Sequence, residues 1–214
     1  DSQGKITGSW KSHTDDLDSE LFKHNFDMNG WEYIHRFLNI KNTIPNASAV
    51  LFKKQTYLQI EGACSHLNLI GDWSVWAKIV SRGDIHFSSR CLNDFRYHAT
   101  SVIATAKQTS GPFRLRRQII LFRSEISNFW QHHLSDSELT PQIYKKNKIF
   151  LYKEVVRNCS FAIRRRHFEE IIPTIRDACN ILPVYLLPIF MFKMAIKLIY
   201  SIIFDAPIKN LLKK

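Results

Sequence analysis

The chain has 214 residues, of which 45% are hydrophobic and 13% aromatic, with only 7 Gly and 7 Pro. This composition excludes a disordered or low-complexity protein and suffices for one core with an appendage. The net charge is +11, and most of it falls in residues 141–214, which carry 14 Lys and Arg against 5 Asp and Glu. A basic segment of this kind is a solvated face, a nucleic-acid surface or an anionic-membrane surface.

The cysteine spacing and the first residues of the chain bear on the cellular setting of the protein. The four cysteines lack the close spacing of metal knuckles and redox motifs, so we expect reduced core thiols in a reducing compartment. The first residues have neither a basic start nor an apolar segment and predict no signal peptide. Because the chain opens in a polar turn without Met, we expect it to come from within a longer protein.

The N-terminal part carries mixed α/β signals. Residues 1–12 predict a short hairpin, and residues 18–26 a short capped helix. Residues 31–38 have apolar side chains at helical spacing. The small, β-branched run Ala47–Phe52 predicts a buried strand.

The next segment has the periodicity of a helix. Trp73, Trp76, Ala77 and Val80 recur at helical spacing, which predicts a helix over residues 72–82. A shorter helix is expected over residues 55–60, with Gly62 ending it. Gly83 is placed to cap the longer helix. Two short strands are then expected at residues 84–88 and 92–97.

The remaining chain is predicted to be helical. Gly111-Pro112 is expected to close the first part, and the next stripe comprises Leu115, Ile119, Phe122, Ile126 and Phe129. Further helices are expected around residues 155–163 and 169–181.

The run Ile181–Phe204 is mostly apolar but is interrupted by Lys193 and Lys197. Each charge near the middle of a bilayer costs roughly 2.5–3.5 kcal/mol on an insertion scale. The four-residue spacing of Lys193, Lys197, Ser201 and Asp205 places them on one helix face, which favours a helix lying in the membrane interface. Packing on the enzyme body or on a second subunit, and a spanning helix, are the alternatives.

Three segments carry a resemblance to a known family. They are Asn46–Lys54, Leu69–Trp76 with its Gly-Asp-Trp, and Leu92–Val102 with its Arg-Tyr-His-Ala-Thr-Ser. In this order and spacing they resemble the acceptor-side half of family 2 glycosyltransferases of the GT-A fold, over roughly residues 1–105. Two features depart from that family: Gly71 stands where its Glu-Asp motif has Glu, and the Asp-x-Asp motif that holds metal and nucleotide is absent.

The resemblance implies an α/β fold class. Residues 1–110 are expected to form an incomplete GT-A domain that lacks the N-terminal nucleotide-binding half. Residues 111–180 form an α-helical extension, and residues 181–214 an apolar, basic, membrane-associating helix.

Asp72 is the expected catalytic base. Inverting transfer is an in-line displacement in which the acceptor hydroxyl loses a proton to a carboxylate. The resemblance gives Asp72 that role, and a helix N-terminus would hold its carboxylate ionised. The alternative is that Asp72 only caps the helix that follows.

The other expected site residues come from the same resemblance. Arg96 and His98 are expected to face the diphosphate, with His98 as a ligand of Mg²⁺ or Mn²⁺ whose main ligands lie in the missing half. The alternative for this pair is a surface strand end with a solvated Arg and a packed His. Asn46, Ser48 and Trp73 are the expected acceptor-binding residues, although loop and core roles compete. His66 is a weaker candidate of the same kind.

The resulting functional expectation is a fragment of an inverting glycosyltransferase in bacterial surface polysaccharide synthesis. Its expected partners are a nucleotide-sugar donor, a glycan or lipid-linked acceptor, an anionic membrane surface and a second copy of the chain. The expected location is cytoplasmic, peripheral on the inner face of the cell membrane. The alternative is a non-catalytic, membrane-associated interaction module. A nucleic-acid binder is not expected, because the aromatic residues sit at core spacings rather than between exposed basic residues.

Overall fold

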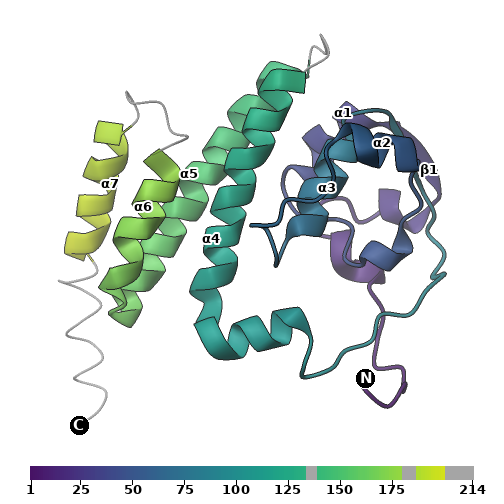
Figure 1. Ribbon diagram of the computed structural model, residues 1–214, viewed down its shortest axis with the longest axis horizontal. Helices are drawn as coiled ribbons and strands as arrows, with labels where there is room; N and C mark the ends of the chain where they lie inside the picture. Colours follow the sequence, from purple (N-terminus) through teal and green to yellow (C-terminus); the bar gives the residue numbers. More distant parts are fainter. Residues whose placement is uncertain (134–138, 180–186, 201–214) are drawn as a thin grey trace.

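The computed structural model describes residues 1–133, 139–179 and 187–200. They form a mixed α/β structure that is mostly helical and contains a small two-stranded antiparallel sheet. Figure 1 shows an N-terminal part of short elements on one side of the long helices α4 and α5, with α6 and α7 beyond them.

The sheet joins two segments far apart in the sequence. Strand β1 (Phe26–Asn29) pairs with β2 (Asp84–Phe87), with Phe26 opposite Phe87 and Asn29 opposite Asp84. The rings of Phe26 and Phe87 stack at 5.1 Å between centroids. The prediction of a strand at residues 84–88 is therefore confirmed.

Short helical elements surround this sheet. Their bounds are η1 (Lys11–Thr14), η2 (Leu21–Lys23), α1 (Gly30–Tyr33), the π-helical turn η3 (Ile34–Leu38), η4 (Ala47–Ala49), α2 (Lys54–Gln59) and α3 (Gly71–Val80). The predicted helix over residues 72–82 is α3, and its Trp73, Trp76, Ala77 and Val80 are buried, as their spacing indicates. Glu61 and Gly62, both with φ near +60 to +70°, reverse the chain after α2, where Gly62 was expected to end the helix.

Two predicted strands are wrong. Asn46 accepts a hydrogen bond from the Ser48 amide, which starts the 3₁₀ turn η4, and most of residues 47–52 are exposed. Residues 92–97 are exposed throughout and have no regular structure. Neither segment has a neighbouring strand to pair with in the part of the chain that the structure describes, and an unpaired strand is not stable. The predicted hairpin over residues 1–12 is also wrong, for the same reason.

The helical part begins before the expected boundary. Helix α4 (Val102–His133) includes Gly111-Pro112, where the sequence predicted a break, so the helical part does not start at residue 111. Figure 1 shows that α4 changes direction in its N-terminal portion. An internal proline removes one backbone hydrogen bond and bends a helix without necessarily ending it.

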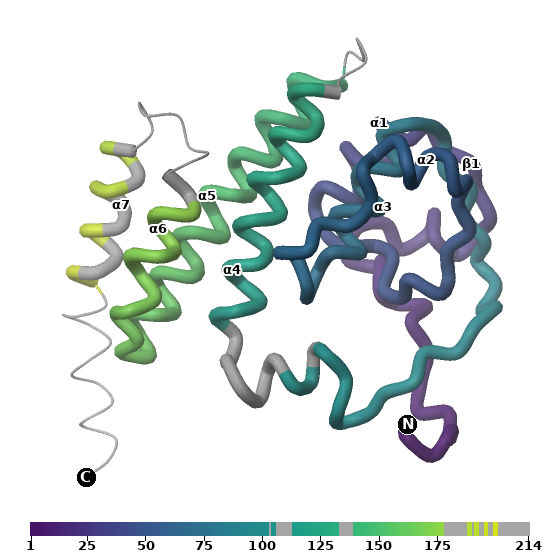
Figure 2. The backbone as a smooth tube through the Cα atoms, in the orientation of Figure 1, coloured from purple at the N-terminus to yellow at the C-terminus, as the bar shows by residue number. Residues whose placement is uncertain are grey.

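The other helices pack along α4. Helix α5 (Thr140–Arg165) runs beside it, followed by η5 (Phe168–Glu170), α6 (Ile171–Cys179) and α7 (Leu187–Tyr200). The tube in Figure 2 shows α4, α5 and α6 side by side, with α7 on the outside. No helix among the described residues is long and apolar enough to cross a membrane.

One core joins the N-terminal part to the long helices. Phe122, Ile126 and Trp130 of α4 belong to the same buried cluster as Trp73 of α3 and Trp31 of α1. A second cluster lies among α4, α5 and α6, around Leu151 and Val155. Residues 1–110 therefore share their core with the helices instead of closing on their own.

Candidate functional site

Asp72 lies in the first turn of α3 and is half-buried. Its Oδ1 accepts a hydrogen bond of 2.7 Å from the amide of the next residue, Trp73. Burial raises the pKa of Asp72 above its ordinary value of 3.8, and bonds from the Trp73 amide and the Asn42 side chain only partly offset this. The sequence led us to expect a carboxylate held ionised by the helix N-terminus, but desolvation outweighs that effect. A higher pKa makes Asp72 a stronger base once it is ionised.

Trp73 is a core residue. Its indole N–H donates to the Leu38 carbonyl at 2.8 Å, and its ring stacks on Phe122 with centroids 4.4 Å apart. The Arg123 guanidinium lies 5.1 Å from the same ring. With one face and the N–H group already engaged, Trp73 positions α3 against α4 and has no open face for a sugar in this arrangement.

Asn46 and Ser48 lie together in the turn η4. The Asn46 side chain is half-buried and accepts from the Ser48 amide at 3.0 Å, which leaves its NH₂ group and the exposed Ser48 hydroxyl facing outward. Two polar side chains on an exposed turn can bind hydroxyl groups, so their assignment to the acceptor stays a prediction.

Arg96 and His98 lie on the exposed segment 91–100. The His98 Nδ1 is 3.0 Å from the Thr100 hydroxyl. Within the described residues, no hydrogen bond or ion pair joins Asp72 to either Arg96 or His98. The structure thus places Asp72 on α3 and both Arg96 and His98 on the exposed segment 91–100, and it does not bring the three into one constellation.

An aromatic cluster that was not predicted lies beside Arg96. Trp10 packs edge-on against Phe95, with centroids 6.2 Å apart, and nearly parallel to Tyr97 at 6.4 Å. All three rings are more than two-fifths exposed. Exposed aromatic faces stack on sugars and bases. The only available signal was the Phe-x-Tyr spacing around Arg96, because the contact with Trp10 spans more than eighty residues.

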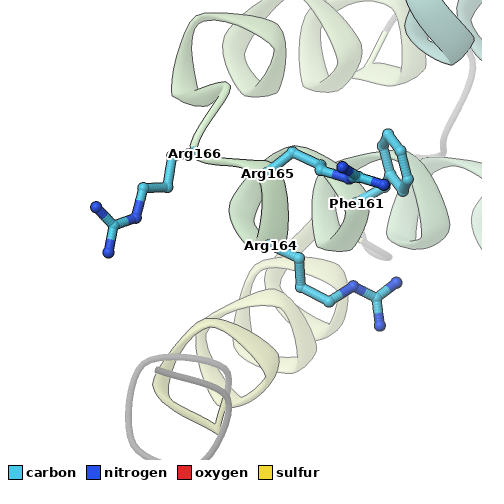
Figure 3. A pocket seen from close by; sticks show the side chains of 4 residues that line it. All are labelled: Phe161, Arg164, Arg165 and Arg166. Atoms are coloured by element: carbon cyan, nitrogen blue, oxygen red, sulfur yellow. The ribbon is translucent and has the colours of Figure 1, made fainter. Parts of the chain in front are cut away.

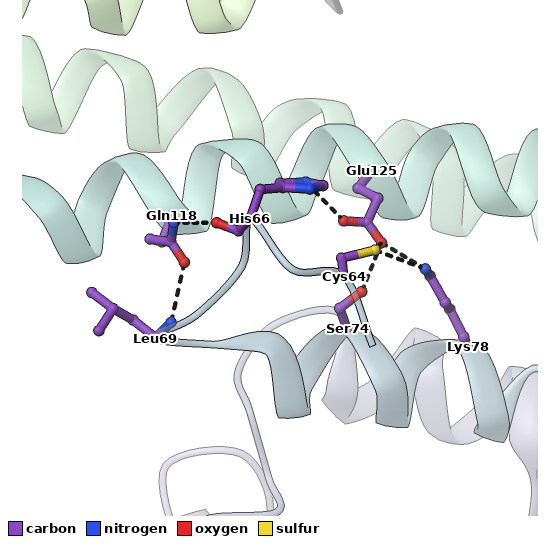
Figure 4. A network of polar contacts seen from close by, with 7 residues as sticks. All are labelled: Cys64, His66, Leu69, Ser74, Lys78, Gln118 and Glu125. Carbon is purple, nitrogen blue, oxygen red and sulfur yellow. Dashed lines mark hydrogen bonds and ion pairs between the residues drawn. The ribbon is translucent and has the colours of Figure 1, made fainter. Parts of the chain in front are cut away.

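A polar network at the α3–α4 interface is the most concentrated chemistry in the described chain. Figure 4 shows Glu125 of α4 surrounded by Cys64, His66, Ser74 and Lys78. The Glu125 Oε1 accepts from the Cys64 thiol at 2.6 Å, the Ser74 hydroxyl at 3.0 Å and the Lys78 ammonium at 2.6 Å. The Lys78 Nζ also lies 3.4 Å from the Cys64 sulfur.

The second oxygen of Glu125 is less well satisfied. Oε2 is buried and has no partner with hydrogen-bond geometry, although His66 Nε2 lies 3.2 Å away. His66 Nε2 is thus close enough to Oε2 for an ion pair but is not aligned for a hydrogen bond. We take Oε2 as electrostatically close to His66 but with lone pairs still available.

Burial and hydrogen bonding shift the pKa values of Glu125 and Lys78 in opposite directions. Burial raises the pKa of Glu125, but bonds from Cys64, Lys78 and Ser74 outweigh it and hold the pKa below the ordinary value. For Lys78, burial lowers the pKa, and the neighbouring Glu125 more than offsets it. Burial and the Glu125 carboxylate both raise the pKa of the Cys64 thiol. The pair Lys78–Glu125 is therefore ionised and Cys64 is a thiol at neutral pH.

The loop that carries Cys64 and His66 is bonded to α4 at two positions, Gln118 and Glu125. Two turns before Glu125, the Gln118 side chain donates to the His66 carbonyl at 2.7 Å and accepts from the Leu69 amide at 3.2 Å. Gln118 and Glu125 share one face of α4, because they are seven residues apart. The loop, the start of α3 and α4 thus form one connected unit.

The expected metal ligand His98 does not belong to a ligand set. Mg²⁺ and Mn²⁺ favour oxygen ligands, and a single exposed imidazole is a poor site for either. Within the described residues, the group of three side chains close enough to share an ion is Cys64, His66 and Glu125. The residues around His98 therefore do not fit the expected Mg²⁺ or Mn²⁺.

A basic patch lies at the other end of the molecule. Arg164 and Arg165 occupy the last turn of α5, and Arg166 caps it in the left-handed conformation. Together with Phe161 they line a shallow pocket, in which Figure 3 shows Arg165 directed toward Phe161 and Arg166 pointing away. No acidic side chain forms an ion pair with these three arginines in the described ranges.

Helix α7 presents an apolar face to solvent. Lys193 and Lys197 lie within it, but their side chains fall outside the described residues, as do Ser201 and Asp205. The described side chains that are about half or more exposed on α7 are Ile189, Met191, Phe192, Ile196, Ile199 and Tyr200.

Comparisons with known protein families, with curated proteins and with solved structures each found no match to this chain.

Proposed function

We propose that this chain is the acceptor-side part of an inverting family 2 glycosyltransferase of the GT-A fold. The proposal is supported by the three ordered segments around Asn46, Asp72 and His98, and by one observation in particular. Asp72 is a half-buried carboxylate at the start of a well-packed helix, with a raised pKa and no cationic partner among the described residues. Carboxylates that serve only as helix caps are usually solvated.

Asp72 accepts the proton of the acceptor hydroxyl in the proposed reaction. The hydroxyl oxygen attacks the anomeric carbon as the nucleoside diphosphate leaves, and the proton passes to a carboxylate oxygen. Packing of Trp73 against Phe122 and Leu38 fixes the first turn of α3 and so holds Asp72 in place. Such positioning is a large part of catalysis by displacement.

The acceptor would lie between α3 and the exposed polar and aromatic segments. Asn46 and Ser48 supply hydrogen bonds, and the cluster of Trp10, Phe95 and Tyr97 supplies a stacking surface. Arg96 remains the proposed partner of the leaving diphosphate. The nucleotide-binding half and its Mg²⁺ or Mn²⁺ site are implied by the resemblance alone, and no step is assigned to that metal.

The test is turnover by a protein that contains this chain together with the nucleotide-binding half. Nucleoside diphosphate release is measured with a panel of UDP-, GDP- and dTDP-linked sugars. Asp72→Asn should lower kcat by on the order of 10²–10⁴. Asp15→Asn, an exposed carboxylate outside the site, should leave it unchanged. Near-normal turnover by Asp72→Asn would leave Asp72 with only a capping role.

Membrane attachment is a second candidate function, favoured by the exposed apolar face of α7. An in-plane helix buries such a face among the acyl chains while basic groups meet the headgroups. Arg164, Arg165 and Arg166 form no ion pair with an acidic side chain in residues 1–133, 139–179 and 187–200, and they would add attraction to anionic lipid. In this proposal the protein is peripheral on the cytoplasmic face of a membrane.

Vesicle flotation tests the attachment. The wild-type chain should float with phosphatidylglycerol vesicles more than with phosphatidylcholine vesicles, and salt should reduce the difference. Phe192→Ser with Ile196→Ser should abolish flotation, whereas Leu58→Ser, on the exposed surface of α2, should not. Equal recovery of the double variant and the wild type would refute the α7 surface.

A further inference from the structure

We propose that Cys64, His66 and Glu125 form a binding site for Zn²⁺ that ties the loop before α3 to helix α4. Their ligand atoms lie within 4.8 Å of one another. The set combines a thiol, an imidazole and a carboxylate, which are the three ligand types that zinc accepts. The inference does not depend on the proposed transferase activity.

The distances fit a small cation after minor adjustment. Ligands at about 2.0–2.3 Å from a tetrahedral zinc ion lie roughly 3.3–3.8 Å from one another. The His66 Nε2–Glu125 Oε2 separation is already 3.2 Å. The Cys64 sulfur lies 2.6 Å from Glu125 Oε1 and moves away from it once its proton is lost.

The buried Glu125 Oε2 is a second indication, independent of the distances, that this site binds a cation. Its lone pairs have no aligned donor among the described residues, and a buried acceptor without one is costly. The other oxygen, Oε1, is already occupied by Lys78, Ser74 and Cys64. Glu125 can therefore bind a cation through Oε2 while Oε1 keeps its bonds to Lys78 and Ser74.

Lys78 both opposes the binding of a cation and orients two of its ligands. Its ammonium is almost fully buried beside the site and repels a cation. However, its bond to Oε1 orients the carboxylate, and its contact with the sulfur stabilises the thiolate that zinc requires. Binding releases the Cys64 proton to solvent, so the thiolate and the carboxylate carry two negative charges against the ion and the Lys78 ammonium, and the occupied site keeps one net positive charge.

The fourth position is open to solvent. The His66 side chain is 57% exposed, so zinc can enter from that side and keep one water molecule as its fourth ligand. Because Gln118 already fixes the same loop to α4, the ligands are largely preorganised. Zinc then acts as a clip between two segments about sixty residues apart in the sequence.

Cobalt spectroscopy on the reduced, metal-free chain tests the site. One equivalent of Co²⁺ should produce a thiolate-to-cobalt charge-transfer band, and Zn²⁺ should displace it. Cys64→Ser should lose the band, while Cys91→Ser, the matched exposed cysteine, should keep it. A wild-type chain without the band, or a band that survives Cys64→Ser, overturns the proposal.

A second variant keeps the test independent of folding defects. His66→Ala removes a mostly exposed side chain, so the protein should fold normally, and its zinc affinity by calorimetry should fall by about tenfold or more. Zinc should raise the Tm of the wild-type chain and not that of His66→Ala. Equal affinity and equal Tm shifts in both proteins contradict the site.

Discussion

Arg123 and Glu125 lie two residues apart on α4, yet the networks around them differ in burial and in the charge of the partner groups. Arg123 is fully enclosed, donates to the carbonyls of Asn39 and Ile40 and to the side chains of Asn39 and Asn147, and lies over aromatic rings. Glu125 is partly open to solvent and keeps one oxygen without an aligned donor. Each side chain leaves one buried atom without an aligned partner, Nε of Arg123 and Oε2 of Glu125. The enclosed Arg123 network holds the fold together, whereas the Glu125 network lies beside the mostly exposed His66 and is available for chemistry.

The partners of Arg123 and Glu125 also differ in charge. Burial lowers the pKa of Arg123 to about 9, so the guanidinium is still charged at neutral pH, and neutral oxygens rather than a carboxylate surround it. Glu125 has an ionised partner in Lys78 and can exchange it for, or share it with, another cation. Stability should therefore depend on Arg123 more than on Glu125.

Removing the Arg123 side chain should have the largest effect. Arg123→Met leaves the buried acceptors of Asn39 and Asn147 without a donor, and we expect a loss of about 3 kcal/mol in the free energy of unfolding. Urea denaturation measures it, with Arg114→Met on the exposed side of α4 as the control. A loss no larger than in the control would contradict the structural role.

Neutralising Glu125 should cost less. Glu125→Gln keeps the size of the side chain but leaves the buried Lys78 ammonium without its anion, so we expect about 2 kcal/mol, below the value for a fully enclosed pair. Adding Lys78→Met should recover part of this loss. Glu32→Gln, which breaks an exposed pair with Arg36, should change the free energy by less than about 0.5 kcal/mol. A Glu125→Gln loss equal to that of Arg123→Met would remove the contrast.

The pH dependence should separate the two networks further. The folded-state pKa of Glu125 lies below its ordinary value of 4.5, so its contribution is present above pH 4.5 and is lost as the pH falls through the folded-state pKa. The Tm difference between wild type and Glu125→Gln should therefore shrink in acid. The difference for Arg123→Met should persist there, because the guanidinium stays charged. Parallel behaviour of both variants in acid would argue against this assignment.

The smallest stability effect is expected at Asp72. Because burial raises the pKa of Asp72, its ionised form is less favourable in the folded chain than in the unfolded chain at neutral pH. Asp72→Asn should therefore leave the free energy of unfolding within about 0.5 kcal/mol or raise it slightly. Thermal denaturation beside Asp15→Asn measures this, and a loss above about 2 kcal/mol would identify Asp72 as a structural cap.

The sequence predicted the helices well where their periodicity was strong. The buried faces of α3 and α5 follow directly from the spacing of Trp73–Val80 and Val155–Ile163. The strands at 47–52 and 92–97 were wrong, because local composition favours a strand but cannot supply the neighbouring strand that stabilises it. Helix α4 continues through Gly111-Pro112, since the packing of its later turns determines the helix more than local propensity does.

The candidate site was predictable only in part. The environment of Asp72 could be anticipated as a helix N-terminus, but its burial, and the Asn42 hydrogen bond that partly offsets the effect of burial on its pKa, depend on the tertiary structure. The network around Glu125 was not anticipated, because its members are separated by up to 61 residues and share no motif. Long-range contacts of this kind become visible only when the α3–α4 packing is known.

The anomeric configuration of the first product tests the central claim most directly. Proton NMR of the product formed in the earliest turnovers, by a protein that carries this chain and the nucleotide-binding half, distinguishes the two stereochemical outcomes. Single displacement with Asp72 as the base predicts a product whose configuration is opposite to that of the donor. A product with retained configuration would contradict that mechanism and the role proposed for Asp72.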